Sequence, residues 1–267
     1  MRVALVHQPY RAETAETARK AAAWLESHGA DSELLSAFDL APQDPGRFGL
    51  ALSFGGDGTT LRTARWAYRS ELPVVPVGMG TLSFLAALTP SDVDEALGPY
   101  LAGDFWRDER AMLCVQVGES RVLALNDVVV ARGAALRAVS IDMAVQGHYV
   151  TRFTADGLVI STATGSTAYA LAAGGPVMAP ELRNIVVVPI AGHLSALGSL
   201  VLPETAEIQL TVARSQPAVV SADGQVDFDL PVNQPIEIRL AEERTIFARR
   251  GDPRDFYAQL TARLHRS

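Results

Sequence analysis

Short apolar runs alternate with helical patterns over the first hundred or so residues of the chain. The runs RVALV, LALSF and PVVPV are continuously apolar, which is typical of strands buried on both faces of a parallel sheet. After the first run, Ala15, Ala18, Ala22 and Leu25 recur at helical spacing, and His28-Gly29 ends the pattern. This part of the chain therefore predicts an α/β layer structure.

From about residue 106 to about residue 245 the pattern changes to closely spaced runs of strand type. These runs are MLCVQV, VLALNDVVVA, VSIDMAV, HYVTRF, NIVVVPI, EIQLTV, AVVSA and IEIRL. They predict a mostly antiparallel, sandwich-like β domain. The last stretch is again helical, with Phe256, Leu260 and Leu264 on one stripe that we expect to pack on the first domain. The predicted domains are residues 1–105 with 246–267, and residues 106–245.

Composition and charge narrow the class of protein. Of the 267 residues, 48% are hydrophobic and 20% charged, as in a folded globular protein. A net charge of −7 disfavours nucleic acid and anionic membrane as partners. The single Cys114 has neither a disulfide partner nor a metal-ligand cluster, so we interpret it as a core thiol in a reducing compartment. The N-terminal stretch fits neither a signal peptide nor a membrane helix, so we expect a cytoplasmic protein.

The stretch LALSFGGDGTTLR places a carboxylate, Asp57, among three glycines between a predicted strand and a helix expected to begin near Thr59. Glycines let a backbone approach a phosphate closely, and a helix N-terminus favours an anion, so the loop is a candidate phosphate cradle. A carboxylate in such a loop suits a base that accepts a hydroxyl proton, or a ligand of magnesium. The alternative is structural: Asp57 caps the helix and the glycines form a tight turn.

Lysine usage limits the mechanism that this loop can support. The only lysine is Lys20, on the early helix, and the chain lacks the GxxxxGK[ST] motif of a P-loop. The glycine pattern does not match the dinucleotide fingerprint GxGxxG either. Charge stabilisation in a phosphoryl transfer would then fall to backbone amides, arginine and metal.

A second candidate segment, DGLVISTATGSTAYALAAGGP, covers residues 156–176. Hydroxyl side chains crowd a turn-rich loop that leads into a short helix, which Ser166 or Thr167 is expected to cap and Gly174-Gly175-Pro176 to end. Tyr169 offers a ring on which a base can stack. The alternative is a purely structural capped helix preceded by a serine/threonine turn.

Together, GGDGT and the longer second motif resemble the NAD kinases, which phosphorylate the adenosine 2′-hydroxyl of NAD. Diacylglycerol and sphingosine kinases share GGDGT, and phosphofructokinases have a near variant, but these enzymes lack the TGSTAY segment. The resemblance implies a phosphofructokinase/diacylglycerol kinase-like α/β domain and a β-rich domain, with the C-terminal helix returning to the first. It also implies NAD with ATP or polyphosphate as substrates, a divalent cation (Mg²⁺), and a homodimer or homotetramer.

The resemblance also implies roles for individual residues. Asp57 matches the residue that accepts the proton of the attacking hydroxyl. The residues implied to bind the dinucleotide are Gly56, Gly58, Asn126, Asp127, Asp156, Thr167, Ala168, Tyr169 and Ala172 and, more loosely, Arg137 and Gln225. Asn126-Asp127 has a β-turn as its alternative, and Asp223-Gly224 has a hairpin turn. His193 is left open between a site residue and a structural one.

The chain also departs from the family pattern at Gly78, Ser83, Ala163, Ala172, Gly198 and Ser199. These departures leave open the phosphoryl donor and the choice between NAD and NADH. The mechanism we expect is direct transfer of a phosphoryl group to the 2′-hydroxyl, with Asp57 as the base and magnesium neutralising charge. A non-catalytic dinucleotide sensor on the same scaffold is the alternative. A lipid kinase is disfavoured because no basic amphipathic helix is evident.

Overall fold

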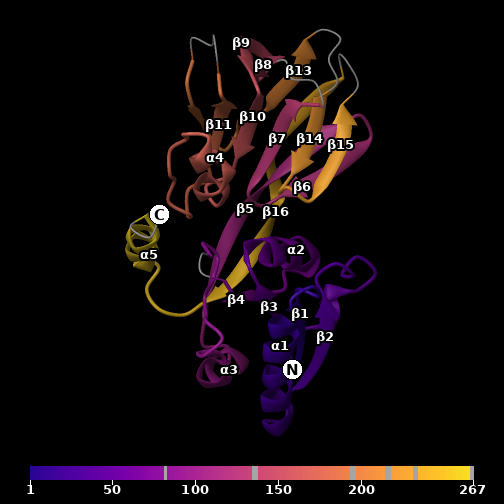
Figure 1. Ribbon diagram of the computed structural model, residues 1–267, viewed down its shortest axis with the longest axis vertical. Coiled ribbons are helices and arrows are strands. Elements are labelled where there is room, and N and C mark those ends of the chain that lie inside the picture. Colours follow the sequence, from indigo (N-terminus) through magenta and orange to yellow (C-terminus); the bar gives the residue numbers. More distant parts are fainter. Residues whose placement is uncertain (81–82, 134–137, 193–196, 214–217, 231–233, 265–267) are drawn as a thin grey trace. The chain divides into compact units, whose positions relative to one another are not determined.

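The computed structural model of the chain describes residues 1–80, 83–133, 138–192, 197–213, 218–230 and 234–264 (Figure 1). The chain divides into two compact units, Met1–Arg110 with Arg244–Ser267, and Ala111–Glu243. Strands β5 (Trp106–Val117) and β16 (Pro235–Arg249) run from one unit into the other. Among the described residues, no helix combines the length and the apolar character that a membrane crossing requires.

The first unit is built on a parallel sheet in the order β2-β1-β3-β4, beside which the end of β16 pairs with β4. The strands are β1 (Arg2–His7), β2 (Asp31–Ser36), β3 (Leu50–Gly55) and β4 (Val74–Gly78). The helices are α1 (Ala12–Ser27), α2 (Asp57–Ala67), α3 (Val93–Leu101) and α5 (Asp255–Leu264), with short 3₁₀ turns at Pro45–Arg47 and Tyr68–Ser70. The predicted strands β1, β3 and β4 are confirmed, whereas β2 and α3 were not predicted.

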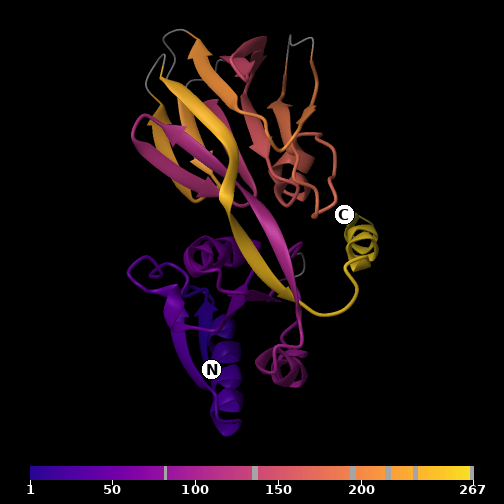
Figure 2. The ribbon, with the colours of Figure 1, turned by 180° about the vertical axis from the view of Figure 1, so that it is seen from behind.

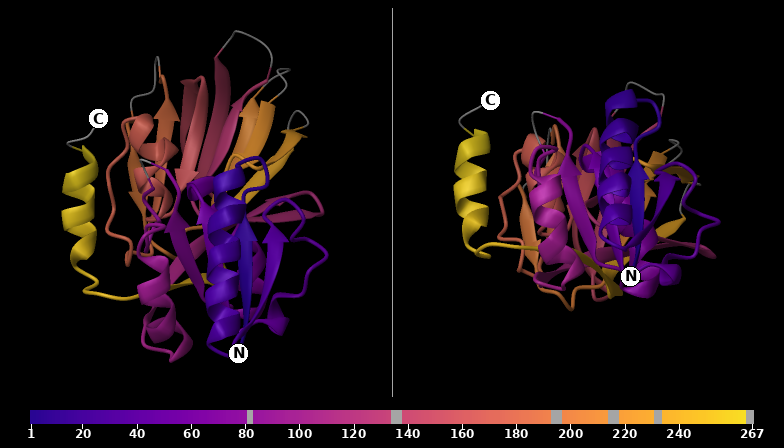
Figure 3. Two further views of the ribbon diagram at one scale, coloured as in Figure 1. Left: turned by 60° about the horizontal axis from the view of Figure 1, so that its bottom comes forward. Right: turned by 90° about the horizontal axis from the view of Figure 1, so that it is seen from below.

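Helices cover both faces of this sheet. On one face, Ala18, Ala21 and Leu25 of α1 pack against alternate residues of β1 and β3 such as Leu5 and Leu52, together with α3. Figure 3 shows α1, the long indigo helix, lying alongside the strands of the first unit. On the other face, Ser53 of β3 lies 3.4 Å from Thr60 of α2, hydroxyl to hydroxyl. Since β3 is buried at every position, its continuously apolar sequence is the consequence of this two-sided cover.

The second unit consists of two antiparallel sheets around a common core. One sheet has the order β12-β11-β10-β7-β14-β15, and the other contains β9, β8, β13 and β16 with the β5–β6 hairpin, which is magenta in Figure 2. The strands are β6 (Ser120–Ala124), β7 (Asp127–Arg132), β8 (Val139–Val145), β9 (His148–Ala155), β10 (Gly157–Ser161), β11 (Ile185–Ile190), β12 (Leu200–Leu202), β13 (Ile208–Ala213), β14 (Ala218–Ala222) and β15 (Val226–Leu230). The predicted antiparallel β-rich architecture is confirmed.

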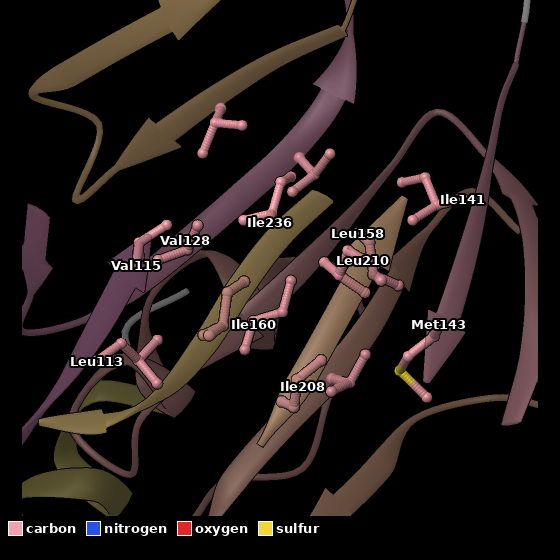
Figure 4. Close-up of a cluster of buried hydrophobic side chains, with 14 of the residues drawn as sticks. Leu113, Val115, Val128, Ile141, Met143, Leu158, Ile160, Ile208, Leu210 and Ile236 are labelled. Atoms are coloured by element: carbon pink, nitrogen blue, oxygen red, sulfur yellow. The ribbon is translucent and has the colours of Figure 1, made fainter. Parts of the chain in front are cut away.

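The inward-facing residues of the two sheets form one apolar core. Val128 of β7 and Ile160 of β10 meet Leu113, Ile141 and Leu210 of the opposite sheet (Figure 4). On the outer face of the β7–β10–β11 region, a smaller cluster packs the short helix α4 (Tyr169–Ala172) and the loop before it against the strands. This loop contains a 3₁₀ turn at Gly165–Thr167. The outer cluster fixes the position of the second candidate motif.

Candidate functional site

The first candidate loop follows β3, as expected, at the carboxyl end of a parallel strand. The helix begins at Asp57, two residues before the expected start near Thr59, so the carboxylate lies in the first helical turn with Gly56 as N-cap residue. A β-carbon at Gly55 would lie 2.3 Å from the Thr59 hydroxyl, which excludes a side chain there. At Gly56 or Gly58 it would meet no other atom of the described residues within 4 Å. The two glycines in the candidate binding set therefore face open space.

Asp57 does not cap the helix that it begins. Instead, its carboxylate turns to the loop after β4: Oδ1 accepts a hydrogen bond from the Ser83 hydroxyl at 2.5 Å and from the Leu85 N–H at 3.3 Å. Oδ2 accepts from the Phe84 N–H at 2.9 Å. The helix-cap interpretation is thus wrong, and the side chain is held in one orientation by a hydroxyl and two amides.

The second candidate region, in the other unit, centres on a break between β6 and β7. In the run VLALNDVVVA, β6 ends at Ala124, Leu125 and Asn126 form the break, and Asp127 begins β7. The Asp223 carboxylate accepts hydrogen bonds from the N–H groups of Leu125, Asn126 and Asp127 at 2.9, 2.7 and 3.3 Å. Asp223 adopts φ +53° and Gly224 φ +59°, so the predicted hairpin turn is present and Asp223 has a second task, which sequence reasoning missed.

The hydroxyl-rich loop holds the same break from its other side. Thr162 donates from its side chain to the Leu125 carbonyl at 2.6 Å, and its N–H donates to the Asn126 carbonyl at 2.9 Å. Ser161 also donates to the Asn126 carbonyl at 3.0 Å. A β-carbon at Gly165 would lie 2.0 Å from that carbonyl oxygen. The STATGST sequence therefore serves as a set of backbone clamps, with glycine required at the point of closest approach.

The expectation that Ser166 or Thr167 caps the short helix is wrong. Ala168 is the N-cap residue, without a side-chain cap hydrogen bond. The Ser166 hydroxyl donates to the Ala163 carbonyl at 2.7 Å and accepts from the Met178 N–H at 2.9 Å, while Thr167 donates to the Thr164 carbonyl. Both hydroxyls are used to fold the loop on itself. Gly174, at φ +85°, ends the helix as predicted.

Asp127 lies buried close to a second carboxylate. Its side chain is 6% exposed, and the backbone N–H of Tyr169 donates to it. Burial, and then the negative charge of Asp223, raise the pKa of the Asp127 carboxyl to about 7. The Asn126 Oδ1 atom is also buried, without a hydrogen-bond partner among the described residues. Two consecutive residues thus carry a carboxyl group with a raised pKa and a buried acceptor that no described residue satisfies.

The other candidate residues fall into different places. Tyr169 is 45% exposed, with its ring accessible. Asp156 forms an ion pair with Arg132 at 3.4 Å, at the opposite end of the β7–β10 ladder from Asp127. Ala172 is exposed at the end of α4, and Gln225 follows the hairpin turn after Gly224. Arg137 and His193 lie outside the described residues.

A buried ion cluster in the first unit was also missed by sequence reasoning. Asp108 and Arg110 form a two-pronged pair with both distances 2.6 Å, and the Arg249 Nε atom lies 3.2 Å from Asp108. Burial alone would raise the pKa of Asp108, but the hydrogen bonds and charges of Arg110 and Arg249 hold this pKa below its usual value. Burial, and then the charge of Arg110, lower the pKa of Arg249 to about 10, which leaves it charged at neutral pH.

Two further features bear on ligands. No group of three or more His, Cys, Asp or Glu side chains that could hold a metal is found in the part of the chain that the structure describes. The second unit has a cavity of about 360 Å³ that contains none of the candidate residues. Its lining is Cys114, Gln116, Arg121, Gly147, Glu207, Ile208, Gln209, Glu237, Ile238 and Arg239. Cys114 is a buried free thiol, as predicted.

Comparison with known proteins places this geometry in a family. The model of the ATP-NAD kinase N-terminal domain matches residues 37–105, and that of the C-terminal domain matches residues 125–249. The chain is 35% identical to the NAD kinase of Chloroflexus aurantiacus over 273 aligned positions, which cover 100% of this chain and 99% of the relative. The chain belongs to the NAD kinase family. An NAD kinase of Dehalococcoides mccartyi is 34% identical, with 98% of this chain and 95% of the relative covered.

Solved structures share the fold of this NAD kinase family member. A yeast NADH kinase complexed with NADH superimposes with a TM-score of 0.86 at 22% identity, covering 98% of this chain and 86% of that one. An NAD kinase from Archaeoglobus fulgidus in complex with ATP gives a TM-score of 0.81 at 24% identity, covering 98% and 99%. The predicted family and the two-domain NAD kinase fold with its β-rich part are confirmed.

Proposed function

We propose that this chain transfers the γ-phosphoryl group of ATP, or the terminal group of polyphosphate, to the 2′-hydroxyl of the adenosine ribose of NAD. The bond between the γ-phosphorus and its leaving oxygen breaks as the 2′-oxygen forms a new bond to phosphorus. Asp57 accepts the hydroxyl proton, and no covalent enzyme intermediate forms. Membership of the NAD kinase family supports the reaction class.

The observation that carries the assignment of the base is the orientation of Asp57. A carboxylate in the first turn of a helix would ordinarily serve the free N–H groups of that turn. Here it is turned to the loop after β4, and among the described residues a β-carbon at either flanking glycine would meet no atom within 4 Å. Such a side chain is fixed before substrate arrives, which is the condition for efficient general-base help.

The dinucleotide is proposed to bind at the break between β6 and β7. A buried acceptor without a partner costs about 1–3 kcal/mol, so Asn126 Oδ1 favours a ligand that brings an N–H donor, such as an adenine amino group. Tyr169 offers an exposed ring for stacking. Asp156, at the other end of the ladder, is proposed to meet the far end of the extended dinucleotide. Thr167, Ala168, Ala172 and Gln225 remain proposed neighbours of the ligand.

Magnesium is proposed to enter with the phosphates of the donor. The described residues offer no acidic cluster for a resident ion, and the Asp57 oxygens already accept bonds from Ser83, Phe84 and Leu85. Mg²⁺ commonly keeps several waters and is held largely by substrate phosphates. We also propose that the protein is a cytoplasmic homodimer or homotetramer. The first unit is proposed to be of phosphofructokinase/diacylglycerol kinase type, because diacylglycerol kinases share its GGDGT motif and phosphofructokinases have a near variant of it.

The reaction is tested directly with purified protein, NAD or NADH, and ATP or polyphosphate in magnesium buffer. NADP is read by glucose-6-phosphate dehydrogenase, and NADPH by chromatography. We expect product with at least one donor. Binding of NAD without product from any of the four combinations would contradict the proposed reaction and would favour a dinucleotide sensor.

A further inference from the structure

The orientation of Asp57 depends on a short loop that is neither helix nor strand. Ser83, Phe84 and Leu85 supply the hydrogen bonds to its carboxylate, at 2.5, 2.9 and 3.3 Å. The Ser83 oxygen in turn accepts from the Ala86 N–H at 3.0 Å, which closes the loop on itself. Because amide donors are aimed by the backbone that carries them, any shift of this loop would misdirect Asp57. The loop therefore needs support from outside its own segment.

That support comes from Arg249, far along the chain. Its Nη1 atom donates to the Leu85 carbonyl oxygen at 2.8 Å, so the backbone of Leu85 is held on its carbonyl side while the N–H of the same residue donates to Asp57. Arg249 is the last residue of β16, which pairs with β4 at Phe247 and Val74. The regular strand β16 thus positions the Arg249 guanidinium as a hydrogen-bond donor to the irregular loop that contains Leu85.

Arg249 is itself held on several sides. Its Nε atom lies 3.2 Å from the Asp108 carboxylate, which also accepts a bidentate pair of hydrogen bonds from Arg110. The side chains of Arg249, Asp108 and Arg110 are 12%, 11% and 10% exposed, and both guanidinium groups lie over the Phe247 ring. Arg249 is therefore pre-organised, and its planar fork can serve the carboxylate and the carbonyl at once.

Stability alone gives a weak reason for such a cluster. Burying ions carries a large desolvation cost, and apolar residues of similar volume are often equally stabilising or more so. What the cluster provides, and apolar residues cannot, is a directed hydrogen bond to the Leu85 carbonyl. The contacts run in an unbroken series from Asp108 through Arg249 and Leu85 to Asp57.

We propose that Arg249, oriented by Asp108, is a positioning residue for Asp57 and sets the rate of phosphoryl transfer through the backbone of Leu85. The inference rests on the proposed role of Asp57 as the base. A misplacement of about 1 Å at a reacting group can cost on the order of 10²-fold in rate. Substitution of Arg249 should then lower kcat by about 10- to 100-fold and leave the Kd for NAD within about twofold.

The experiment compares R249M, which removes the donor, with R249K, which keeps the charge without the fork, and with R249A. R244M is the matched control, since Arg244 lies on the same strand in a 2.6 Å ion pair with Glu109 but is 47% exposed. We expect the order of kcat to be wild type and R244M, then R249K, then R249M. Unfolding curves for each variant report the folded fraction, so that turnover is expressed per folded molecule.

Chemical rescue separates positioning from general stability. Millimolar methylguanidinium should restore kcat of R249A several-fold and leave R249M, whose side chain fills the space, unchanged. Wild-type kcat in R249M, or a loss with no rescue in R249A and no intermediate rate in R249K, would overturn the proposal.

A double variant distinguishes this inference from the assignment of the base. If Arg249 acts through Asp57, then D57N/R249M should turn over no more slowly than D57N alone, because the residue to be positioned has already lost its function. If the fold-losses in kcat of the two single variants multiplied in D57N/R249M, Arg249 would not act through Asp57. The assignment of Asp57 as the base would still stand. If D57N alone kept wild-type kcat, the base assignment would fail first.

Discussion

Two carboxylates, one in each unit, show how neighbours prepare the same side chain for different tasks. Asp57 accepts hydrogen bonds from a hydroxyl and two amides of a neighbouring loop. Asp127 is instead buried beside Asp223, and its pKa is raised to about 7. The first arrangement fixes direction, as a proton acceptor requires. The second keeps a carboxyl partly protonated near neutral pH, so that it can donate to or accept from a bound ligand.

The largest effect is expected for Asp57→Asn, which tests the role of Asp57 as the proton acceptor. General-base help is commonly worth about 10²- to 10⁴-fold, so kcat should fall by that factor while the Kd for NAD stays within about twofold. Steady-state kinetics and calorimetry measure the two quantities. D44N is the matched control, because Asp44 does cap a helical turn by accepting from the Gly46 N–H, and it should keep its activity. A normal kcat for D57N would remove Asp57 from the chemistry.

Asp127→Asn tests the raised pKa of the second carboxylate. Because the folded-state pKa of Asp127 is raised to about 7, from about 3.9 when unfolded, the folded protein binds more protons between these values. The stabilisation of wild type relative to D127N should be present below about pH 4 and be lost as the pH rises to about 7, a change on the order of 2–4 kcal/mol. Urea unfolding from pH 4.5 to pH 8 measures it.

The control for this experiment is D229N, since Asp229 is exposed on β15. The difference in unfolding free energy between wild type and D229N should stay nearly constant over this pH range. Parallel stability curves for wild type and D127N across the whole range would mean that Asp127 is not held beside Asp223 as described.

Gly165→Ala tests whether the hydroxyl-rich loop presents the second carboxylate. The added methyl group would fall 2.0 Å from the Asn126 carbonyl oxygen, so loop and strand break must separate. Overpacking of this kind costs about 1–3 kcal/mol in unfolding free energy, and the affinity for NAD should fall by about tenfold. G198A adds a methyl group that would have no atom of the described residues within 4 Å, and it should change neither quantity. An unaltered Kd for NAD in G165A would separate this loop from the binding site.

The smallest expected effect is that of Tyr169→Ala. Stacking of a base on an aromatic ring is worth about 1–3 kcal/mol, and the exposed position of Tyr169 favours the lower end of this range. The Kd for NAD should rise about fivefold, with kcat little changed. Y169F keeps the ring and should bind as wild type does. If Y169A and Y169F bound NAD equally weakly, the hydroxyl group and not the ring would be responsible for the affinity.

Sequence reasoning reached the elements with a strong local signal. The apolar runs of β1, β3 and β4 and the many strands of the second unit follow directly from period and composition. By contrast, four of the six residues of β2 (DSELLS) are polar and only Leu35 is fully buried, so the strand has no apolar run to mark it. The short α3 was also missed; it contains Pro99, and proline inside a helix is unfavourable.

The candidate site was found only in part, because its support comes from distant segments. Asp57 was evident from its glycines, but the residues that hold it lie 26 to 28 positions further along the chain. Asp223 was interpreted only as a hairpin residue, because its hydrogen bond from the Leu125 N–H joins residues 98 positions apart in the sequence. No local pattern marks Arg249, which acts 164 positions away on Leu85. Ser83, an evident departure from the family pattern, was the one available clue to the loop.

The most direct test of the account is a crystal structure of the protein with NAD bound, in which the distance from the Asp57 carboxylate to the adenosine 2′-oxygen is measured. If Asp57 is the base, this distance should be about 2.6–3.2 Å, with Ser83, Phe84 and Leu85 still donating hydrogen bonds to the carboxylate. A 2′-hydroxyl bonded to another side chain, with Asp57 facing away from it, would contradict the account.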